Sequence, residues 1–418
     1  MLTKIEVLNY RALRYINQSL EPFQVLIGPN ASGKTTFLDV IAFIRDVISD
    51  QTPIEAIRNR SSDIYDLTWM KRTDWLELAV EARIPEKIRP QKSYTHIRYE
   101  IRLGIQEEKH ELALLAETLW LIGSETSNGI KQGKLFPQPP DPPDRLTRDP
   151  DKNTRNPPGW RKIVSKSSRG NDYFRSETTD WNNLFRLGPK RSALANLPAD
   201  DSRFPASTWF KQYISEGVQR IMLNSEALRR PSPPQSPRAF LPDGSNLPWV
   251  VEELTATHPD RFAEWIDHVR TALPDILAIK SLERPEDRHR YLAVDYASGV
   301  SVPSWVVSDG TLRMLALTLL PYLPNLNGLY LIEEPENGIH PRAVETVFQS
   351  LSSVYDGQVL VATHSPIILS LASPKQLLCF ARTSEGATDI IRGDQHPRLH
   401  EWKGEIGLGT LFASGVLG

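Results

Sequence analysis

A glycine-rich turn between a short apolar segment and a helical pattern constrains the fold most. Residues 28–35 match the phosphate-binding pattern GxxxxGK[ST]. The apolar residues 23–27 predict a buried strand before the turn, and apolar side chains from Phe37 to Ile48 recur on one face of a helix that begins at Lys34. A strand, a tight turn and a helix N-terminus together surround anions with backbone N–H groups. The sequence therefore predicts an α/β domain with a phosphate loop.

The loop supplies residue types that bind a nucleotide. Lys34 would reach the β- and γ-phosphates, and the hydroxyl of Thr35 would bind Mg²⁺. The glycines could instead serve only the turn, but the motif, the strand and the helix agree with a nucleotide site. The candidate contacts in this segment are Gly28, Pro29, Asn30, Ala31, Ser32, Gly33, Lys34, Thr35 and Thr36.

A second predicted strand ends in paired carboxylates. The apolar residues 329–332 precede Glu333 and Glu334, and ligands of parallel sheets bind at the carboxyl ends of strands. Glu333 would hold the Mg²⁺ shell, and Glu334 would polarise the attacking water as a general base. An acidic strand end is also common as solvated surface. A further strand over residues 358–363 precedes His364, which could sense the γ-phosphate or be structural.

A third segment, Ser308 to Thr311, precedes a helical pattern with Leu312 and Leu319 on its apolar face. Serine is a good N-cap residue, and the start of a helix attracts anions. Ser308 and Gly310 could therefore contact a phosphate, or Ser308 could act only as a cap.

In this order, the segments resemble ABC-type ATPases of the SMC/RecF-like group, nearest the stand-alone ATPases related to OLD-family proteins. Many of those proteins are found in bacterial anti-phage systems. The resemblance covers roughly residues 1–110 and 215–418. Besides the phosphate loop and the carboxylate strand, it rests on Lys4–Arg11, Leu241–Pro248, Ser308–Leu312, Glu336–Pro341 and His364.

The resemblance implies an α/β P-loop ABC-type ATPase head with a mixed or parallel central sheet, an antiparallel β subdomain and a helical and loop insertion. It implies ATP and Mg²⁺ as cofactors and a homodimer in which Ser308 and Gly310 of one copy face the γ-phosphate held by the other. The catalytic residues that it implies are Glu334, His364 and Lys34, and the metal ligands are Thr35 and Glu333.

Three features depart from the family pattern or leave it open. The usual Walker B aspartate is Glu333 here, and its extra methylene would alter the distance to the metal. No Q-loop glutamine can be assigned, although residues 63–69 are the expected region. Arg11 and Arg14 could reach the nucleotide, as first-strand arginines do in some relatives, or be ordinary surface charge.

We divide the chain into three consecutive segments. Residues 1–123 are expected to form an N-terminal ATPase lobe, residues 124–240 an insertion, and residues 241–418 a C-terminal ATPase lobe. Strands of an antiparallel sheet are predicted over residues 75–84, 96–105 and 111–122.

The insertion begins with a polar, proline-rich stretch over residues 124–176, which is expected to be loop, extended or partly disordered. Its basic residues could contact a nucleic-acid backbone, although a solvated linker is the favoured interpretation. These residues are Arg161, Lys162, Lys166 and Arg169. Helices are expected to resume over residues 209–228.

Composition favours a cytoplasmic protein of one or two domains. The 418 residues are 40% hydrophobic, and the formal net charge of −2 shows no basic bias toward nucleic acid. The only cysteine, Cys379, lies in an apolar run and is expected to be buried, which fits a reducing compartment. No segment is apolar and long enough for a membrane span, and the N-terminus lacks a signal segment.

We expect an ATP-binding and ATP-hydrolysing switch that senses infection or foreign DNA and controls a separate effector protein. About fifty residues follow His364, too few for a fused TOPRIM nuclease domain. The alternative is a RecF-like clamp that binds DNA during repair or maintenance. Two further alternatives are less favoured. The insertion disfavours a transporter subunit, and the intact Lys34 and Glu334 disfavour a degenerate scaffold.

Overall fold

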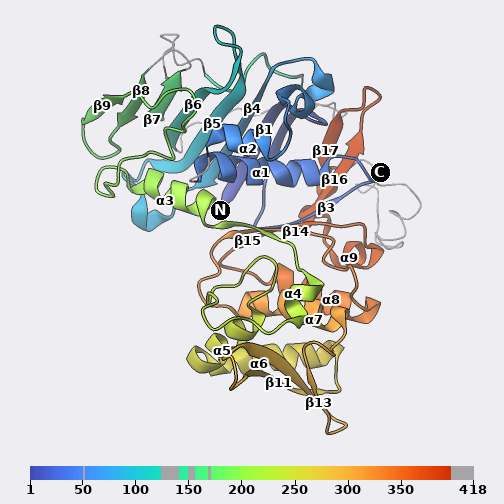
Figure 1. Ribbon diagram of the computed structural model, residues 1–418. Helices are drawn as coiled ribbons and strands as arrows, with labels where there is room; N and C mark the ends of the chain where they lie inside the picture. Colours follow the sequence, from blue (N-terminus) through green and yellow to red (C-terminus); the bar gives the residue numbers. More distant parts are fainter. Residues whose placement is uncertain (50–51, 124–140, 149–155, 168–170, 397–418) are drawn as a thin grey trace. The chain divides into compact units, whose positions relative to one another are not determined.

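The computed structural model describes residues 1–49, 52–123, 141–148, 156–167 and 171–396 (Figure 1). The chain forms two compact units. Unit 1 contains residues 1–21, 29–218 and 380–391, and unit 2 contains residues 22–28, 219–379 and 392–418. The units do not follow the three consecutive sequence segments, because the strand at residues 23–27 belongs to the sheet of unit 2.

Unit 1 is built on an antiparallel sheet. Among the described residues its strands run in the order β2-β1-β4-β5-β6-β7-β8-β9. Strands β4, β5 and β6 correspond to the three strands predicted from the sequence. The bounds are β1 (Leu2–Tyr10), β2 (Leu13–Ser19), β4 (Trp75–Arg83), β5 (Tyr94–Gln106), β6 (Glu111–Gly123), β7 (Trp160–Ser167), β8 (Asp172–Arg175) and β9 (Asn182–Phe185).

The expectation of loop, extended or partly disordered chain for residues 124–176 missed β7 and β8, which pair into the sheet beyond β6. The reason is that Ile163, Val164 and Phe174 are buried, an apolar pattern that the surrounding prolines and charges obscure. The prolines at 137, 139 and 140 lie outside the described residues.

The basic residues of this stretch are engaged within unit 1. Arg161 donates a hydrogen bond of 2.6 Å to the carbonyl oxygen of Ser176. The ammonium of Lys166 is buried and lies 2.6 Å from the carboxylate of Asp172. Neither is a free phosphate contact, and Arg169 lies outside the described residues.

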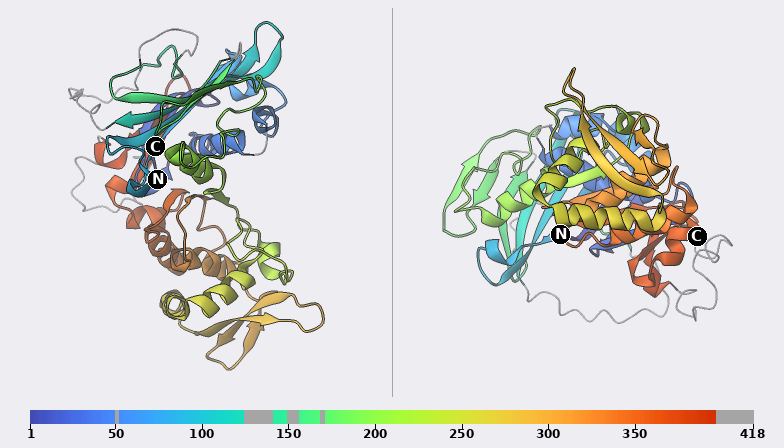
Figure 2. Two further views of the ribbon diagram at one scale, coloured as in Figure 1. Left: turned by 90° about the vertical axis from the view of Figure 1, so that its left-hand side faces the viewer. Right: turned by 90° about the horizontal axis from the view of Figure 1, so that it is seen from below.

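Three helices of unit 1 lie against one face of this sheet (Figures 1 and 2). They are α1 (Lys34–Ile48), α2 (Pro53–Arg58) and α3 (Pro205–Ser215). The apolar face of α1 is buried as its periodicity predicts. The hairpin of β16 (Leu377–Arg382) and β17 (Thr388–Arg392) also contributes, since the rings of Phe37 and Phe380 meet edge to face at 5.6 Å.

Buried carboxylates join loops to the sheet of unit 1. Glu77 accepts hydrogen bonds from the backbone N–H groups of Leu146 and Thr147, and Glu117 accepts them from Ala193 and Leu194. Burial raises the pKa of Glu77, because removal from water disfavours its charged form. These carboxylates are partnered and thus structural.

Unit 2 contains the parallel sheet that the phosphate loop requires. Strand β15 (Gln358–Ala362) lies between β14 (Leu329–Glu333) and β3 (Phe23–Ile27), and β3 also pairs with the start of β16. Strand β10 (Val218–Ile221) lies beside β14. Every residue of β15 is buried, as expected for a strand covered on both faces.

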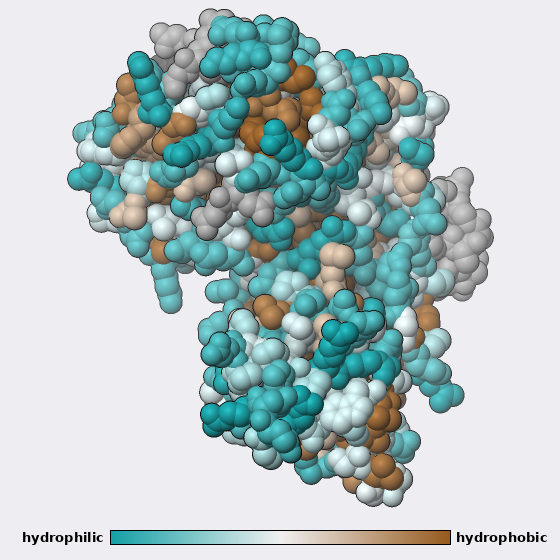
Figure 3. All heavy atoms as spheres, viewed as in Figure 1, coloured by the Kyte–Doolittle hydropathy of each residue, from teal (hydrophilic) through white to brown (hydrophobic). Residues whose placement is uncertain are grey.

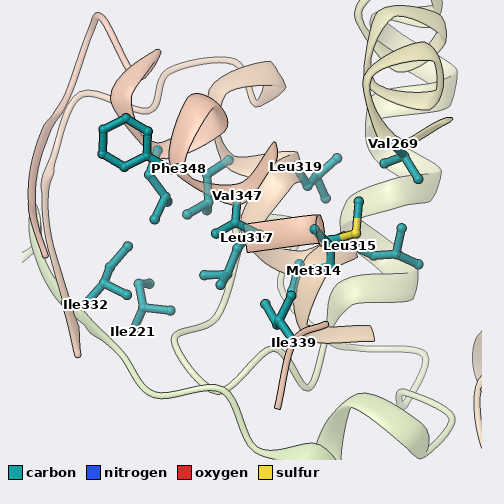
Figure 4. Close-up of a cluster of buried hydrophobic side chains, with 14 of the residues drawn as sticks. Ile221, Val269, Met314, Leu315, Leu317, Leu319, Ile332, Ile339, Val347 and Phe348 are labelled. Carbon is teal, nitrogen blue, oxygen red and sulfur yellow. The ribbon is translucent and has the colours of Figure 1, made fainter. Parts of the chain in front are cut away.

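Helices and a small sheet complete unit 2. Its core includes Met314, Leu317, Ile339 and Phe348, which belong to one buried cluster with Ile332 of β14 (Figure 4). The remaining elements are α4 (Ser225–Arg229), α5 (Leu247–Thr257), α6 (Pro259–Ala272), β11 (Ile276–Glu283), β12 (Arg290–Tyr296), β13 (Ser301–Pro303), α7 (Asp309–Leu319), α8 (Pro341–Ser352) and α9 (Pro366–Leu371).

The small antiparallel sheet of β11, β12 and β13 is partly exposed to solvent. Apolar side chains reach the surface at this end of unit 2 (Figure 3), and Leu277, Leu282 and Val300 are exposed.

Cys379, in contrast, is buried as predicted, and burial raises its thiol pKa to about 12. It is therefore a core residue and not a thiolate. Among the described residues, none of the helices combines the length and the apolar character that a membrane crossing needs.

Candidate nucleotide site

The phosphate loop leaves the carboxyl end of β3 and runs into α1. Gly28 and Gly33 have φ values of 148° and 105°, which L-residues rarely adopt. Gly33 occupies the N-cap position of α1 and has no side chain to cap it. The amine of Lys34 donates a hydrogen bond of 3.1 Å to the carbonyl oxygen of Pro29. The loop therefore curls around its own lysine at a helix N-terminus, the geometry that favours phosphate.

A buried hydroxyl in the loop fits a polar ligand. Ser32 is fully buried, and its Oγ has no hydrogen-bond partner among the described residues. A buried polar atom without a partner costs free energy. A phosphate oxygen bound in the loop would remove that cost.

The two carboxylates predicted from the sequence lie at the carboxyl end of β14. Glu333 is the last residue of the strand, and its Oε1 lies 2.5 Å from a guanidinium nitrogen of Arg220. Glu334 is exposed and has a φ of 47°, which is uncommon for a residue with a side chain. Its backbone N–H donates to the carbonyl oxygen of Ala362 at 2.7 Å, and its carboxylate accepts a hydrogen bond from the amide of Asn337. The main chain thus holds Glu334 in a conformation that turns it out of the strand.

The parallel pairing brings several predicted residues to one sheet edge. Glu333 is paired with Ala362 of β15, and Ala362 is paired with Leu26 of β3. The carboxyl ends of these strands therefore lie side by side, with Glu333, His364 and Gly28 following them. This is the edge at which parallel sheets bind ligands.

The residue before His364 ties this edge to the loop after β14. The hydroxyl of Thr363 donates to Oε1 of Glu336 at 2.5 Å and accepts the N–H of Ser365 at 2.8 Å. Ser365 in turn caps α9. His364 is thereby held between a buried threonine and a capped helix.

Ser308 caps α7, as one of the two interpretations of the sequence requires. Its Oγ accepts the backbone N–H of Thr311 at 3.2 Å. Arg229 holds the neighbouring Asp309, with 2.6 Å between the guanidinium and the carboxylate, and this contact lowers the pKa of Asp309. Capping leaves the exposed side of Ser308 open to a second role.

Close packing explains why position 310 is a glycine. A Cβ atom at this position would lie 2.2 Å from the carbonyl oxygen of Gly338. The start of α7 and the loop at 336–341 are therefore in direct backbone contact. The glycine is required by this approach, whether or not it also faces a phosphate.

A pocket of about 540 Å³ opens beside Glu333 and Glu334. Its polar lining includes Arg220, Asn224 and Arg313, none of which the sequence interpretation identified. Strand β10, which carries Arg220, has only four residues, and two of them are polar. Such a segment has too little apolar alternation to stand out.

Two further sequence interpretations can be placed. Arg11 lies 3.5 Å from Asp39, and Arg14 lies 2.6 Å from Glu385, so each has a carboxylate partner within unit 1. The region considered for the Q-loop forms two short 3₁₀ turns, Ile64–Leu67 and Trp69–Lys71. It contains no glutamine.

The residues available for Mg²⁺ are oxygen donors. Among the described residues, no group of three or more histidine, cysteine or acidic side chains forms a metal cluster. Mg²⁺ in nucleotide sites is held by few protein oxygens together with phosphates and water, and the Thr35 hydroxyl of unit 1 and the Glu333 carboxylate of unit 2 are donors of that kind. Glu333 would have to exchange its contact with Arg220 for the hydrated ion.

Comparison with known proteins identifies the class. The chain belongs to the family described as "AAA domain, putative AbiEii toxin, Type IV TA system", whose model matches residues 23–370. A search of curated proteins gave no match.

Solved structures of low sequence identity also match the chain. "Crystal structure of the SmcHead bound to the C-winged helix domain of ScpA" has 13% identity and a TM-score of 0.54, with 93% of this chain and 96% of that chain covered. An Smc head with an extended coiled coil, bound to the C-terminal domain of ScpA derived from Pyrococcus furiosus, has 12% identity, a TM-score of 0.47 and coverages of 93% and 95%. The SMC head domain from Thermotoga maritima has 10% identity, a TM-score of 0.40 and coverages of 94% and 98%.

The fold is therefore that of an ABC-type, SMC-like ATPase head, with the parallel and antiparallel sheets expected from the sequence. The family and the fold agree with the resemblance that the motifs suggest. They support an ATPase of this class.

Proposed function

We propose that the chain binds and hydrolyses ATP with Mg²⁺ and acts as a molecular switch. The proposal rests on the residues that come together at one edge of the parallel sheet. The phosphate loop starts there at Gly28, and Glu333 and Glu334 follow a parallel strand two positions away. A phosphate cradle and a carboxylate pair on one edge are the two parts that nucleotide hydrolysis needs.

In this proposal each residue has a separate role. Lys34 binds the β- and γ-phosphates, and the loop N–H groups orient them. Glu334 accepts a proton from the attacking water, while His364 contacts the γ-phosphate. Mg²⁺, held by Thr35 and Glu333, neutralises charge that develops on the phosphates.

We further propose that two copies sandwich ATP head to tail. Ser308 and Gly310 of the second copy would meet the γ-phosphate at the start of α7. The exposed position of Ser308 and the N-terminus of an eleven-residue helix support this role. Because the contact between Gly310 and Gly338 joins α7 to the loop after Glu334, hydrolysis could be transmitted to the dimer contact.

The biological role that we propose is a sensor ATPase of an anti-phage system that acts on a separate effector protein. The family description names a putative toxin of a toxin–antitoxin system, which is a system of interacting components. An SMC head was solved with a domain of ScpA bound, which supports an ATPase head as a platform for a protein partner. We place the activity in the cytoplasm.

The decisive experiment is the solution mass of Glu334→Gln with and without ATP and Mg²⁺. We expect a monomer that becomes a dimer only when ATP is present, because the variant binds but does not hydrolyse. Lys34→Ala is the matched control and should stay monomeric. A mass that ignores ATP in both proteins would contradict the sandwich, and failure of both the parent and Glu334→Gln to bind ATP would contradict the proposed function as a whole.

A further inference from the structure

A threonine near the end of the described chain contacts the phosphate loop directly. Thr388, at the start of β17, is buried, and its hydroxyl donates a hydrogen bond of 2.8 Å to the carbonyl oxygen of Ser32. Its backbone N–H donates to the carbonyl oxygen of Ala12 at 2.9 Å. The two partners in the first contact are 356 residues apart in sequence, and Thr388 lies beyond the residues matched by the family.

The fit between Thr388 and the loop is close. A Cβ atom on Gly33 would lie 2.2 Å from Oγ1 of Thr388, and the φ of Gly33 is +105°. A Cβ at this position would therefore force Thr388 to move, and the positive φ would add backbone strain. The nearby edge contact of Phe37 with Phe380 fixes the first turns of α1 to the same hairpin.

The hydrogen bond sets the direction of a peptide group. The Ser32–Gly33 peptide is trans, like every described peptide bond, so its C=O and N–H point in opposite directions. When Thr388 holds the carbonyl of Ser32 toward the hairpin, the N–H of Gly33 is turned away from it. A phosphate-binding loop needs N–H groups that point away from the hairpin that holds the loop, so that they are available to the anion.

We propose that Thr388 is a positioning residue that holds the phosphate loop in its nucleotide-binding conformation. This inference rests on the proposed binding of ATP by residues 28–36. The β-phosphate is common to ATP and ADP, so the contact strengthens the binding of both nucleotides. Because it acts equally before and during reaction, it changes KM and not kcat.

The test is a set of substitutions in one hairpin. Thr388→Val removes the hydroxyl with little change in volume, and Thr388→Ser retains it. Thr383→Val is the matched control, since its hydroxyl accepts the N–H of Ala387 within the hairpin turn and does not contact the loop in the described structure. ATP and ADP dissociation constants are measured by calorimetry, together with the melting temperature without nucleotide.

We expect Thr388→Val to weaken ATP and ADP by the same factor of about three to ten, the equivalent of one buried hydrogen bond. Thr388→Ser and Thr383→Val should bind within about twofold of the parent. In turnover assays, the KM of Thr388→Val should rise by that factor while kcat stays near the parent value.

Several outcomes would overturn the inference. One is a Thr388→Val protein with a lowered melting temperature and parental nucleotide affinity, since Thr388 would then only stabilise the fold. Equal weakening by Thr383→Val would assign the effect to the hairpin as a whole. If Thr388→Val does not fold, Thr388→Cys, with a weakly donating thiol, must bind ATP more weakly than Thr388→Ser. Failure of the parent to bind any nucleotide would refute the proposed function instead.

Discussion

Arg220 and Glu333 form an ion pair with 2.5 Å between the guanidinium and the carboxylate. Arg220 comes from β10 and Glu333 ends the neighbouring strand β14, so the contact crosses the edge at which the candidate site lies. The Nε of Arg220 is buried and has no hydrogen-bond partner among the described residues. The carboxylate proposed to hold the Mg²⁺ shell is thus already engaged by a cation.

The first prediction follows from competition for Glu333. Arg220→Gln should lower the Mg²⁺ concentration for half-maximal ATP hydrolysis by about 1.4- to fivefold, because a partly exposed ion pair is worth about 0.2–1 kcal/mol. Mg²⁺ titrations of ATPase activity measure this. Arg229→Gln breaks the similarly exposed pair with Asp309 and should leave the half-saturating concentration unchanged. An increase in that concentration for Arg220→Gln would mean that Arg220 supports metal binding.

The second prediction concerns the general base. Glu334→Gln should reduce ATP hydrolysis by roughly 100-fold or more while nucleotide affinity stays near the parent value, because the side chain keeps its shape and loses its basicity. Steady-state phosphate release and equilibrium binding test this together. Glu345→Gln, an exposed carboxylate on α8, is the control. Parental hydrolysis by Glu334→Gln would show that another group activates water.

The third prediction separates capping from phosphate contact at Ser308. Asp and Asn are both good N-caps, so Ser308→Asp and Ser308→Asn should melt at similar temperatures. Only the aspartate adds a charge that repels a triphosphate. In the Glu334→Gln background, we expect the asparagine variant to form the ATP-dependent dimer and the aspartate variant to remain monomeric. Dimers of both variants would argue against a phosphate at the start of α7.

The fourth prediction tests the backbone contact between Gly310 and Gly338. Gly310→Ala should destabilise the protein by about 1–3 kcal/mol, since the added methyl group meets a carbonyl oxygen and forces the backbone to move. Urea unfolding gives the change in free energy. Gly310 lies in α7 and its φ is not positive, so backbone conformation adds no cost to the alanine and the loss measures the close contact. Unchanged or increased stability of Gly310→Ala would contradict that contact.

The fifth prediction concerns pH. Nδ1 of half-buried His268 lies 2.8 Å from the hydroxyl of Tyr322, and burial lowers the pKa of His268. A lowered folded-state pKa means that the unfolded chain takes up the proton first, so the stabilisation is present above the unfolded value of about 6.5 and is lost as pH falls through the folded value.

Urea unfolding between pH 8 and pH 5 measures this loss. As pH falls, the free energy of unfolding of the parent should decrease relative to that of His268→Gln. Tyr322→Phe should retain the pH dependence, because burial and not the hydrogen bond causes the pKa shift. Parallel pH profiles for the parent and His268→Gln would contradict the assignment.

The parts of the site that can be predicted from sequence are those made by adjacent residues. The loop from Gly28 to Thr35 contains its strand end, its turn and its helix start in one segment, and Glu333 and Glu334 follow an unbroken apolar strand. Such patterns depend on local backbone geometry. The parallel strands then determine which edge these segments share.

The parts that were missed depend on tertiary pairing. Arg220 matters only because the short strand β10 is placed beside β14, and Thr388 matters only because β17 reaches the phosphate loop. Strands β7 and β8 were missed for a different reason. Their buried apolar residues are few, and the composition of the surrounding stretch is dominated by prolines and charges.

The position of β3 has a consequence for biosynthesis. Phe23–Ile27 is made long before both of its sheet neighbours, β15 and β16. At about 5–20 residues per second, roughly 15–70 seconds separate the emergence of β3 from that of β15. During that interval its apolar residues have no permanent partners on the nascent chain. The parallel sheet can therefore assemble only after β15 and β16 have left the ribosome, more than three hundred residues after β3.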